Sequence, residues 1–547
     1  MLNPLNNRTM KSIIYVALTL LIWSCASKEE VDLIVTNGNI YTINDTFESA
    51  EAFAVKNGKF IAVGSVKQIQ SNYSTSKLID AKGKAIFPGL IDGHCHFYGL
   101  GTNMLAVDLM GTNSYAQILE RVQNFQKERQ VSYIYGRGWD QNDWELKEFP
   151  TKKELDALFP NTPVALERVD GHAIIANQAA LDLASVSNDF EIAGGEVIRS
   201  NGQLTGVLLD AAADYVLAKR PEFTTTEKIA ALKQAERECF SYGLTTVTDA
   251  GLDRSVIELI DSLQQINELK MRVYAMVSGT TKNLDYYLEK GLYKTERLNV
   301  RSFKIYGDGA LGSRGATLRK PYSDRAHHHG TLSNSIEFFE TTAKRIAKSK
   351  FQMNTHAIGD STNHLLLDIY KRELEGQTNR RWRIEHAQIV SPEDFESFKN
   401  VIPSVQPTHA TSDMYWAEDR LGAERLKGGY AFKDLLKQHG KITLGTDFPV
   451  EYVNPFLTFY AATARQDTKG YPEGGFQIEN ALTREETIKG MTVWAAYANF
   501  EENEKGSIEV GKFADFTILE NNLMEVDLKI IPDTKVIATY VNGEKVY

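Results

Sequence analysis

The 547-residue chain has few cysteines and no surplus of basic charge, and each shortage excludes a class of protein. Its three cysteines lie far apart, at positions 25, 95 and 239, so they form neither a zinc knuckle nor a disulfide framework. The formal charge is −10, which argues against a nucleic-acid partner because phosphate binding needs a basic stripe. With 42% hydrophobic and 24% charged residues, the chain is globular and not disordered.

The N-terminus lacks an apolar run long enough to span a bilayer stably. Two basic residues precede a run from Ile13 to Trp23, which suits a signal peptide. The run ends at Leu21–Cys25, a segment similar to the lipoprotein box of bacteria. We therefore expect residues 1–24 to be a signal peptide and residues 25–30 to be a tether with a lipid on Cys25. This predicts an exported lipoprotein at the periplasmic face of a membrane or at the cell surface, with ordinary secretion as the alternative.

Both ends of the remaining chain have the pattern of short strands separated by tight turns. Asn-Gly pairs, a strong hairpin signal, follow apolar runs at Asn37-Gly38, Asn57-Gly58 and Asn542-Gly543. Neither end is long enough to bury a core by itself. We therefore expect residues 31–84 and 501–547 to pair into one small composite β-sandwich.

Between these ends, residues 85–500 alternate apolar strands with helical segments, the pattern of an α/β protein. Eight strand–helix units favour a closed parallel (β/α)8 barrel of the TIM type, whose functional residues come from the C-terminal ends of the strands. A stretch at about 100–221 interrupts the alternation and is predicted to fold as an insertion over the barrel mouth. The predicted strands are Ile86–Ile91, Thr245–Asp249, Arg272–Val277, Ser302–Tyr306, Gln352–Thr355, Trp382–Glu385, Ile402–Val405 and Ile442–Gly445.

Polar side chains occur at the ends of five of these strands. His94 and His96 end the first, and both imidazoles can point at one object because alternate residues of a strand share a face. By itself a His-x-His pair is ambiguous, since two polar residues often close a strand. The other groups are Lys304 on the fourth strand, His356 at the end of the fifth, His386 after the sixth and Asp447 at the end of the eighth. Six such groups at one mouth are hard to explain as packing, and a metal ion would satisfy them.

Six longer sequence motifs contain or accompany these polar groups. They are Pro88–His96, Lys304–Arg314, His356–Asp360, Arg383–Gln388, Gly445–Val450 and Lys505–Phe516. The sequence resembles the amidohydrolase superfamily, in the branch that includes N-substituted formamide deformylase, from about Val31 to its end. The resemblance implies a barrel with a composite β-domain. It also implies a metal-dependent hydrolase that cleaves a carbon–nitrogen bond other than a peptide bond, such as that of an N-substituted formamide.

The resemblance also implies the cofactor and its ligands. One metal would be held by His94, His96 and Asp447, the other by His356 and His386, with Lys304 as an N6-carboxylated bridge. One or two zinc ions are expected, with iron, manganese and a mononuclear site as alternatives. Considered alone, Lys304 would more simply snorkel or pair with Asp308. A metal lowers the pKa of bound water from about 16 to about 7, so a metal-bound hydroxide would attack the carbonyl and Asp447 would pass the proton to the leaving amine.

Weaker predictions concern the substrate. Asp170 and His172 match a family segment thought to approach the active site, although a structural turn explains them equally well. An apolar pocket with one cation would be lined by Trp139, Tyr306, Arg314 and Trp416, each of which is more often a core or rim residue. The histidines interpreted as structural are His364, His409 and His439.

Two other functions remain open. The same metal machinery would serve N-acyl amino acids or cyclic amides. A binding lipoprotein without catalytic activity is the alternative from another class, and the complete ligand set argues against it. The expected partners are a small amide-like substrate and a membrane reached through the lipid on Cys25, and a homo-oligomer is compatible with the sequence.

Overall fold

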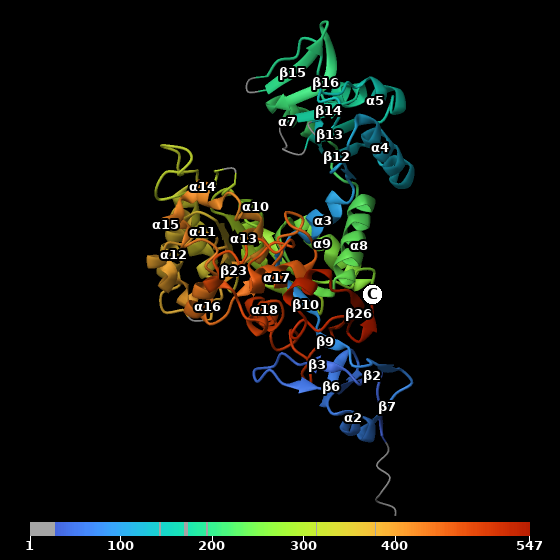
Figure 1. Ribbon diagram of the computed structural model, residues 1–547, viewed down its shortest axis with the longest axis vertical. Coiled ribbons are helices and arrows are strands. Elements are labelled where there is room, and N and C mark those ends of the chain that lie inside the picture. Colours follow the sequence, from blue (N-terminus) through green and yellow to red (C-terminus); the bar gives the residue numbers. More distant parts are fainter. Residues whose placement is uncertain (1–27, 142–143, 169–172, 193–194, 313, 378) are drawn as a thin grey trace, which may run out of the picture.

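A computed structural model of the protein shows a barrel with a β-domain at one end and an inserted lobe at the other (Figure 1). The structure describes residues 28–141, 144–168, 173–192, 195–312, 314–377 and 379–547. The predictions for Cys25, Asp170 and His172 lie outside these residues. Among the described helices, none is both long and apolar enough to cross a membrane.

Eight strands form the barrel, each parallel to the next. They are β10 (Leu90–Cys95), β17 (Leu244–Leu252), β18 (Arg272–Ser278), β20 (Leu298–Tyr306), β21 (Gln352–Ala357), β22 (Arg383–His386), β23 (Ile402–Val405) and β24 (Thr443–Leu444). The ring closes between β24 and β10, where the amide of Asp447 donates to the carbonyl of His94 and the amide of His96 to the carbonyl of Phe448, both at 2.8 Å. The predicted (β/α)8 barrel is therefore confirmed.

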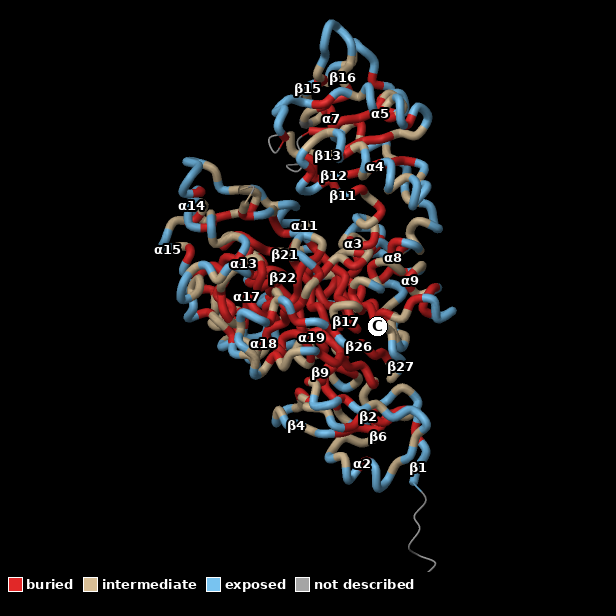
Figure 2. The backbone as a smooth tube through the Cα atoms, turned by 45° about the vertical axis from the view of Figure 1, so that its right-hand side comes forward, coloured by how far each residue is buried: buried red, intermediate tan, exposed pale blue. Residues whose placement is uncertain are grey.

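Helices that follow the strands cover the barrel, and Figure 2 shows the buried residues concentrated inside it. Helix α9 illustrates why they form: its apolar residues recur at helical spacing, so Val256, Ile257, Ile260 and Leu263 share a buried face. The main helices are α3 (Phe97–Asn103), α8 (Thr225–Ser241), α9 (Arg254–Gln265), α10 (Thr281–Lys290), α11 (Ile336–Ala347), α12 (Asp360–Glu373), α13 (Pro407–Asp413), α14 (Ala417–Leu421), α16 (Phe432–His439), α17 (Pro455–Ala464), α18 (Arg484–Gly490) and α19 (Val493–Ala498).

The predicted strand Ile86–Ile91 is wrong, because the chain changes sheets at Gly89. Strand β9 (Ala85–Pro88) pairs with strands of the β-domain, and the barrel strand β10 begins only at Leu90. A Cβ atom on Gly89 would lie 2.2 Å from Oγ1 of Thr245, so this close passage requires glycine. Periodicity could not reveal the change, since both strands are buried and read as one apolar run.

The two ends of the chain form one β-sandwich. The first sheet has the order β6 (Lys59–Gly64), β5 (Ala52–Lys56), β2 (Leu33–Thr36), β8 (Leu78–Asp80). The second has the order β27 (Glu544–Lys545), β26 (Val536–Val541), β25 (Phe516–Leu519), β9, β3 (Asn39–Tyr41), β4 (Ser49–Ala50). Both sheets contribute rings to one core, where Phe53 packs edge-on against Phe516. The predicted composite sandwich is confirmed.

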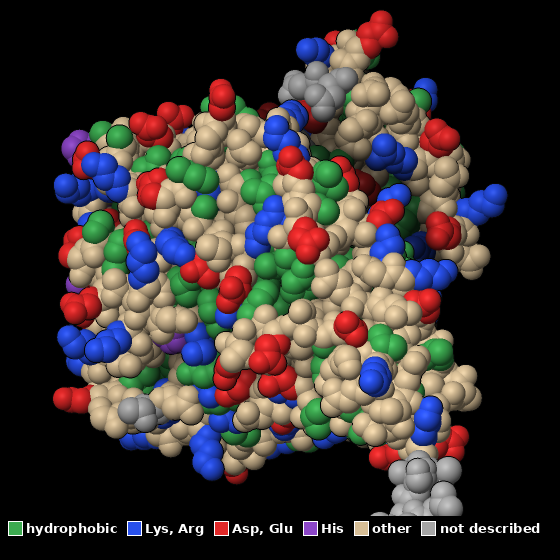
Figure 3. All heavy atoms as spheres, turned by 60° about the horizontal axis from the view of Figure 1, so that its bottom comes forward, with side chains coloured by type: hydrophobic (Ala, Val, Ile, Leu, Met, Phe, Trp, Pro, Cys, Tyr) green, Lys and Arg blue, Asp and Glu red, His purple; other side chains and the backbone are tan. Residues whose placement is uncertain are grey.

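A buried ion pair joins the sandwich to the barrel. The guanidinium of Arg272, on β18, donates to both carboxylate oxygens of Asp515 at 2.6 and 3.0 Å. On the surface, Figure 3 shows acidic and basic side chains interspersed over one face of the molecule.

The insertion is a lobe of its own at the C-terminal side of the barrel (Figures 1 and 2). Its sheet has the order β11 (Val107–Asp108), β12 (Ile134–Trp139), β13 (Val164–Arg168), β14 (Ala173–Ala176), β16 (Gln203–Asp210), β15 (Gly195–Ser200). The helices of the lobe are α4 (Tyr115–Arg129), α5 (Lys153–Leu158), α6 (Gln178–Leu183) and α7 (Ala211–Leu217). Two separate groups of buried apolar residues stabilise it.

Candidate metal centre

The six side chains predicted to bind metal come from five barrel strands or the residues that follow them. His94 lies on β10 and His96 directly follows it, Lys304 lies on β20, His356 on β21 and His386 at the end of β22, and Asp447 follows β24. The strands are parallel, so their C-terminal ends meet at one mouth of the barrel. Topology therefore brings together residues that are far apart in the sequence.

Short distances connect these groups. The Nε2 atoms of His96 and His94 lie 3.2 and 3.5 Å from Oδ1 of Asp447. The ring of His386 has its centroid 4.5 Å from that of His356 and 4.8 Å from that of His94. His94, His386 and Asp447 each offer one ligand atom, and these atoms lie within 4.8 Å of one another. These three residues could hold a metal ion, and they include members of both predicted ligand sets.

Electrostatics favours the metal-binding form of His94, His356, His386 and Asp447. Burial lowers the pKa of His356 to about 3, and it lowers the pKa of His94 and His386 well below the ordinary value. These imidazoles are therefore neutral and have a lone pair for a metal. Burial alone would raise the pKa of Asp447, but its hydrogen bond with His96 and the neighbouring histidines hold that pKa well below the usual range. Asp447 is therefore a carboxylate.

Lys304 is 1% exposed and points at the same cluster. Burial lowers the pKa of its ammonium group, and Nζ lies 3.2 Å from Nε2 of His94. The alternative partner Asp308 has its oxygens occupied by other groups, the backbone amides of Thr317, Ile358 and Gly359. Burial thus shifts Lys304 toward its neutral amine form.

The donor atoms fit a metal ion. Two buried imidazole nitrogens of the predicted ligands, Nε2 of His356 and Nδ1 of His386, have no hydrogen-bond partner among the described residues. A buried polar group without a partner costs about 1–3 kcal/mol, and coordination would remove that cost. A set of imidazoles with one carboxylate suits zinc, and also iron or manganese.

The backbone is strained at two of the ligands. His386 has φ 72° and Asp447 has φ 62°, in the left-handed region that costs non-glycine residues roughly 1–3 kcal/mol. Asp92 helps to hold this arrangement, because it accepts hydrogen bonds from the amide of His94 and from the hydroxyl group of Thr446. Thr446 directly precedes Asp447, so Asp92 ties together two ligand-bearing segments. Strain maintained in this way is typical of a functional site.

A protein-family model described as the amidohydrolase family matches residues 77–547. The chain belongs to this family. It is 32% identical over 537 residues to the protein LONG AFTER FAR-RED 3 of Arabidopsis thaliana, covering 94% of this chain and 91% of that protein. It is 24% identical over 547 residues to N-substituted formamide deformylase of Arthrobacter pascens, covering 94% and 97% respectively. An uncharacterized metal-dependent hydrolase from Pyrococcus furiosus has a similar structure, with a TM-score of 0.77 and 26% identity over 90% of this chain and 100% of that one. The predicted resemblance is confirmed.

The amidohydrolase has two further groups at this site that the sequence analysis did not select. Oε2 of Glu385 lies 2.5 Å from Nδ1 of His94, and both side chains are fully buried. His409 was interpreted as structural, but its Nε2 lies 3.6 Å from Oδ2 of Asp447. Signals existed for both, since Glu385 directly precedes the ligand His386 and His409 follows the seventh strand, to which no site residue had been assigned.

Two of the residues predicted to contact substrate, Tyr306 and Trp139, lie in different environments. Tyr306 ends β20, is 46% exposed, and has its ring centroid 5.8 Å from that of His356, so the amidohydrolase presents it beside the ligands. Trp139 is fully buried in the insertion, where its indole N–H donates to the carbonyl of Leu166 at 2.7 Å. The structure brings Tyr306 to the cluster and places Trp139 in the core of the lobe.

The other two residues predicted to contact substrate, Arg314 and Trp416, are connected through Asp324 and Arg420. The guanidinium of Arg314 donates to both oxygens of Asp324 at 3.0 and 2.7 Å. Arg420 also bonds to Asp324 and lies over the ring of Trp416, 5.5 Å from its centroid. The cation predicted to orient substrate thus has a carboxylate partner within the amidohydrolase itself.

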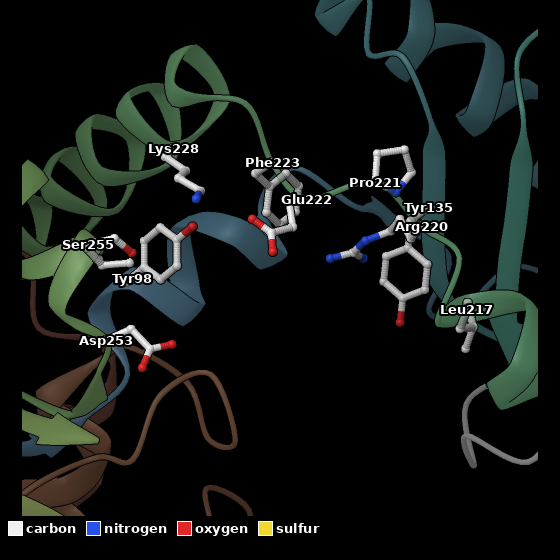
Figure 4. Close-up of a pocket in the computed structure, with 11 residues that line it drawn as sticks. Tyr98, Tyr135, Leu217, Arg220, Pro221, Glu222, Phe223, Lys228, Asp253 and Ser255 are labelled. Carbon is white, nitrogen blue, oxygen red and sulfur yellow. The ribbon is translucent and has the colours of Figure 1, made fainter. Parts of the chain in front are cut away.

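A cleft of about 600 Å³ lies between the insertion and the barrel (Figure 4). Tyr98, two residues after the predicted ligand His96, lines it from α3, and Tyr135 lines it from the insertion. Arg220 lies over the ring of Tyr135, 4.8 Å from its centroid. Lys228 of α8 points into the same space in Figure 4. The cleft thus places residues of the insertion next to the element that follows His96.

Proposed function

We propose that this amidohydrolase cleaves the carbon–nitrogen bond of a non-peptide amide, such as an N-substituted formamide, with Asp447 as the group that moves the proton. The observation that carries the proposal is the position of Asp447, a buried carboxylate among the imidazoles of the predicted ligands. The relationship to a formamide deformylase supports the amide class. N-acyl amino acids and cyclic amides contain the same carbonyl–nitrogen unit and are the alternative substrates.

In this proposal the side chains at the mouth would hold one or two metal ions. With two ions, His94, His96 and Asp447 would hold one, and His356 and His386 would hold the other. When bound, a divalent metal lowers the pKa of water from about 16 to about 7 and polarises the carbonyl oxygen of the substrate. Zinc is the expected metal because the site is rich in imidazole.

After a covalent step, Lys304 would supply a carbamate as a further ligand to the metal. Its neutral Nζ attacks the carbon of carbon dioxide, a carbon–nitrogen bond forms, and a proton leaves Nζ for solvent. The resulting carbamate offers two anionic oxygens, whereas an ammonium group would repel divalent cations. The lowered pKa of Lys304 supports this step, because it raises the fraction of neutral amine.

Asp447 supplies general base and then general acid catalysis. Its carboxylate accepts a proton from the attacking water as the water oxygen bonds to the carbonyl carbon. It then gives that proton to the substrate nitrogen as the carbon–nitrogen bond breaks, so the products are a carboxylic acid and an amine. The left-handed backbone at Asp447 aims its side chain toward His94 and His96.

Replacement of Asp447 by asparagine tests this assignment. We expect Asp447→Asn to fold, to retain metal, and to lose turnover almost completely, because loss of a general base typically costs 100- to 10,000-fold. Turnover is measured on a panel of N-substituted formamides, N-acyl amino acids and lactams, with Asp45→Asn in an exposed turn as the matched control. A variant that kept most of its activity would contradict the role. A metal-loaded wild type inert to the whole panel would favour a binding lipoprotein.

We also propose that the protein is anchored by a lipid on Cys25. Support comes from the sequence, in which the apolar run ends directly before this cysteine. Wild type should fractionate with membranes and Cys25→Ser should not, with Ser27→Ala as the control. Recovery of both proteins in the same fraction would contradict the anchor, and protease treatment of intact cells would separate the cell surface from the periplasm.

A further inference from the structure

The two carboxylate oxygens of Asp447 face different partners. Oδ1 lies 3.2 Å from Nε2 of His96 and 3.5 Å from Nε2 of His94, on the side of the proposed ligands. Oδ2 lies 3.6 Å from Nε2 of His409. His409 belongs to α13, which follows the seventh barrel strand. The carboxylate therefore lies between the metal ligands and an imidazole outside the ligand set.

His409 is held firmly in this place. Its ring is stacked on that of His386, with centroids 5.9 Å apart and planes inclined by 15°. Its side chain is only 13% exposed. Its Nε2 has no hydrogen-bond partner within 3.5 Å among the described residues, so Asp447 is the acceptor it faces. The parallel packing against His386 and the low exposure restrain the ring, and in this orientation Nε2 faces Asp447.

Two contacts fix α13 relative to the ligand-bearing loops. At its end, Asp413 accepts a hydrogen bond at 3.1 Å from Gln388, which lies two residues after the ligand His386. On its exposed side, Ser412 donates at 2.7 Å to Glu451, which lies in the loop that follows Asp447. Movement of the helix is therefore restrained from both sides, and the distance from His409 to Asp447 is a property of the fold.

We propose that His409 is a positioning residue for Asp447, which donates its Nε2–H to Oδ2 and so keeps Oδ1 directed at His94 and His96. The terminal torsion of an aspartate is soft and roughly two-fold, so a fixed donor at one oxygen selects one orientation of the carboxylate. Groups that orient metal ligands commonly change metal affinity or activity 10- to 100-fold. The inference rests on the proposed function only in naming Asp447 as a ligand and proton carrier.

Two variants of His409 separate its ring from its nitrogen. His409→Phe keeps an aromatic ring that can stack on His386 but removes the donor, and His409→Gln restores an N–H of similar reach. We expect His409→Phe to bind zinc 10- to 100-fold more weakly, and to lower kcat by a similar factor with little change in KM. His409→Gln should recover most of the zinc affinity and most of kcat. His364→Phe on α12, away from the ligands, is the matched control and should change neither.

A double-mutant cycle tests whether His409 acts through Asp447. Zinc affinity is measured by competition with a chelator, a readout that needs no substrate. In the Asp447→Asn background, His409→Phe should weaken zinc binding no further, because the carboxylate to be oriented is already gone. Additive losses, or wild-type zinc affinity in His409→Phe, would overturn the proposal. If His409→Phe does not fold, the same cycle is run with His409→Leu, which also lacks the donor and must show the same weaker zinc binding and the same coupling with Asp447→Asn.

The zinc measurement also separates this inference from the proposed function. Coupling between His409 and Asp447 without turnover of any amide would leave the positioning role intact and refute the reaction. Turnover of an amide without that coupling would support the reaction and refute the positioning role.

Discussion

The hydrogen bond between Glu385 and His94 leads to a quantitative prediction about metal affinity. Oε2 of Glu385 lies 2.5 Å from Nδ1 of His94, and both side chains are fully buried. The contact fixes the tautomer in which His94 presents Nε2 to a metal and raises the basicity of that nitrogen. Glu385→Gln keeps the volume and an acceptor oxygen but removes the negative charge.

The expected magnitude follows from the role of such partners. Loss of a group that orients a metal ligand costs 10- to 100-fold in affinity, equal to about 1.4–2.8 kcal/mol. At a fixed zinc concentration well above both dissociation constants, the stabilisation of the folded protein by zinc should fall by the same amount. The metal-free forms of wild type and Glu385→Gln should differ little, whereas Glu385→Ala should lose about a further 1–3 kcal/mol because Nδ1 of His94 is left unpaired.

Two independent assays check this. Chelator competition gives the dissociation constant for zinc, and denaturant unfolding with and without zinc gives the stabilisation. Glu258→Gln, which replaces an exposed carboxylate on α9, is the control. If Glu385→Gln binds zinc as tightly as wild type, or if the two assays disagree about the loss, the assigned role of Glu385 is refuted.

Three further predictions concern protonation, packing and the lysine. Burial lowers the pKa of His356 to about 3, while the unfolded chain keeps about 6.5, so acidification between these values protonates only the unfolded state. In urea unfolding of the metal-free protein below pH 6.5, the free energy of unfolding of wild type should therefore fall by about 1.4 kcal/mol per pH unit relative to that of His356→Asn. A difference between the two that stayed constant with pH would contradict this. Arg272→Met should lower the free energy of unfolding in denaturant by about 3–5 kcal/mol, because Asp515 becomes an unpaired buried charge. Adding Asp515→Leu should restore most of that loss. Metal-stripped protein should regain activity only with both zinc and bicarbonate if Lys304 is carboxylated, and recovery with zinc alone would argue against the carbamate.

Local patterns were sufficient for the architecture and for the polar groups that meet at the barrel mouth. Apolar strands alternating with helical segments specify a parallel barrel, and a barrel brings the C-terminal ends of its strands together whatever the loops between them. His94, His356 and Asp447 could therefore be placed at one mouth from their positions at strand ends. Their residue types then indicated a metal, because no packing role explains so many buried polar groups.

The tertiary structure decided which of the remaining residues belong to the site. Glu385 was not selected and His409 was interpreted as structural, because their partners His94 and Asp447 lie in distant segments and local periodicity carries no information about such contacts. The change of sheet at Gly89 was hidden for a related reason, since two buried strands in succession have the same apolar pattern as one. The sequence by itself determined which groups reach the barrel mouth. Which of them touch, and through which atom, depended on packing between distant segments.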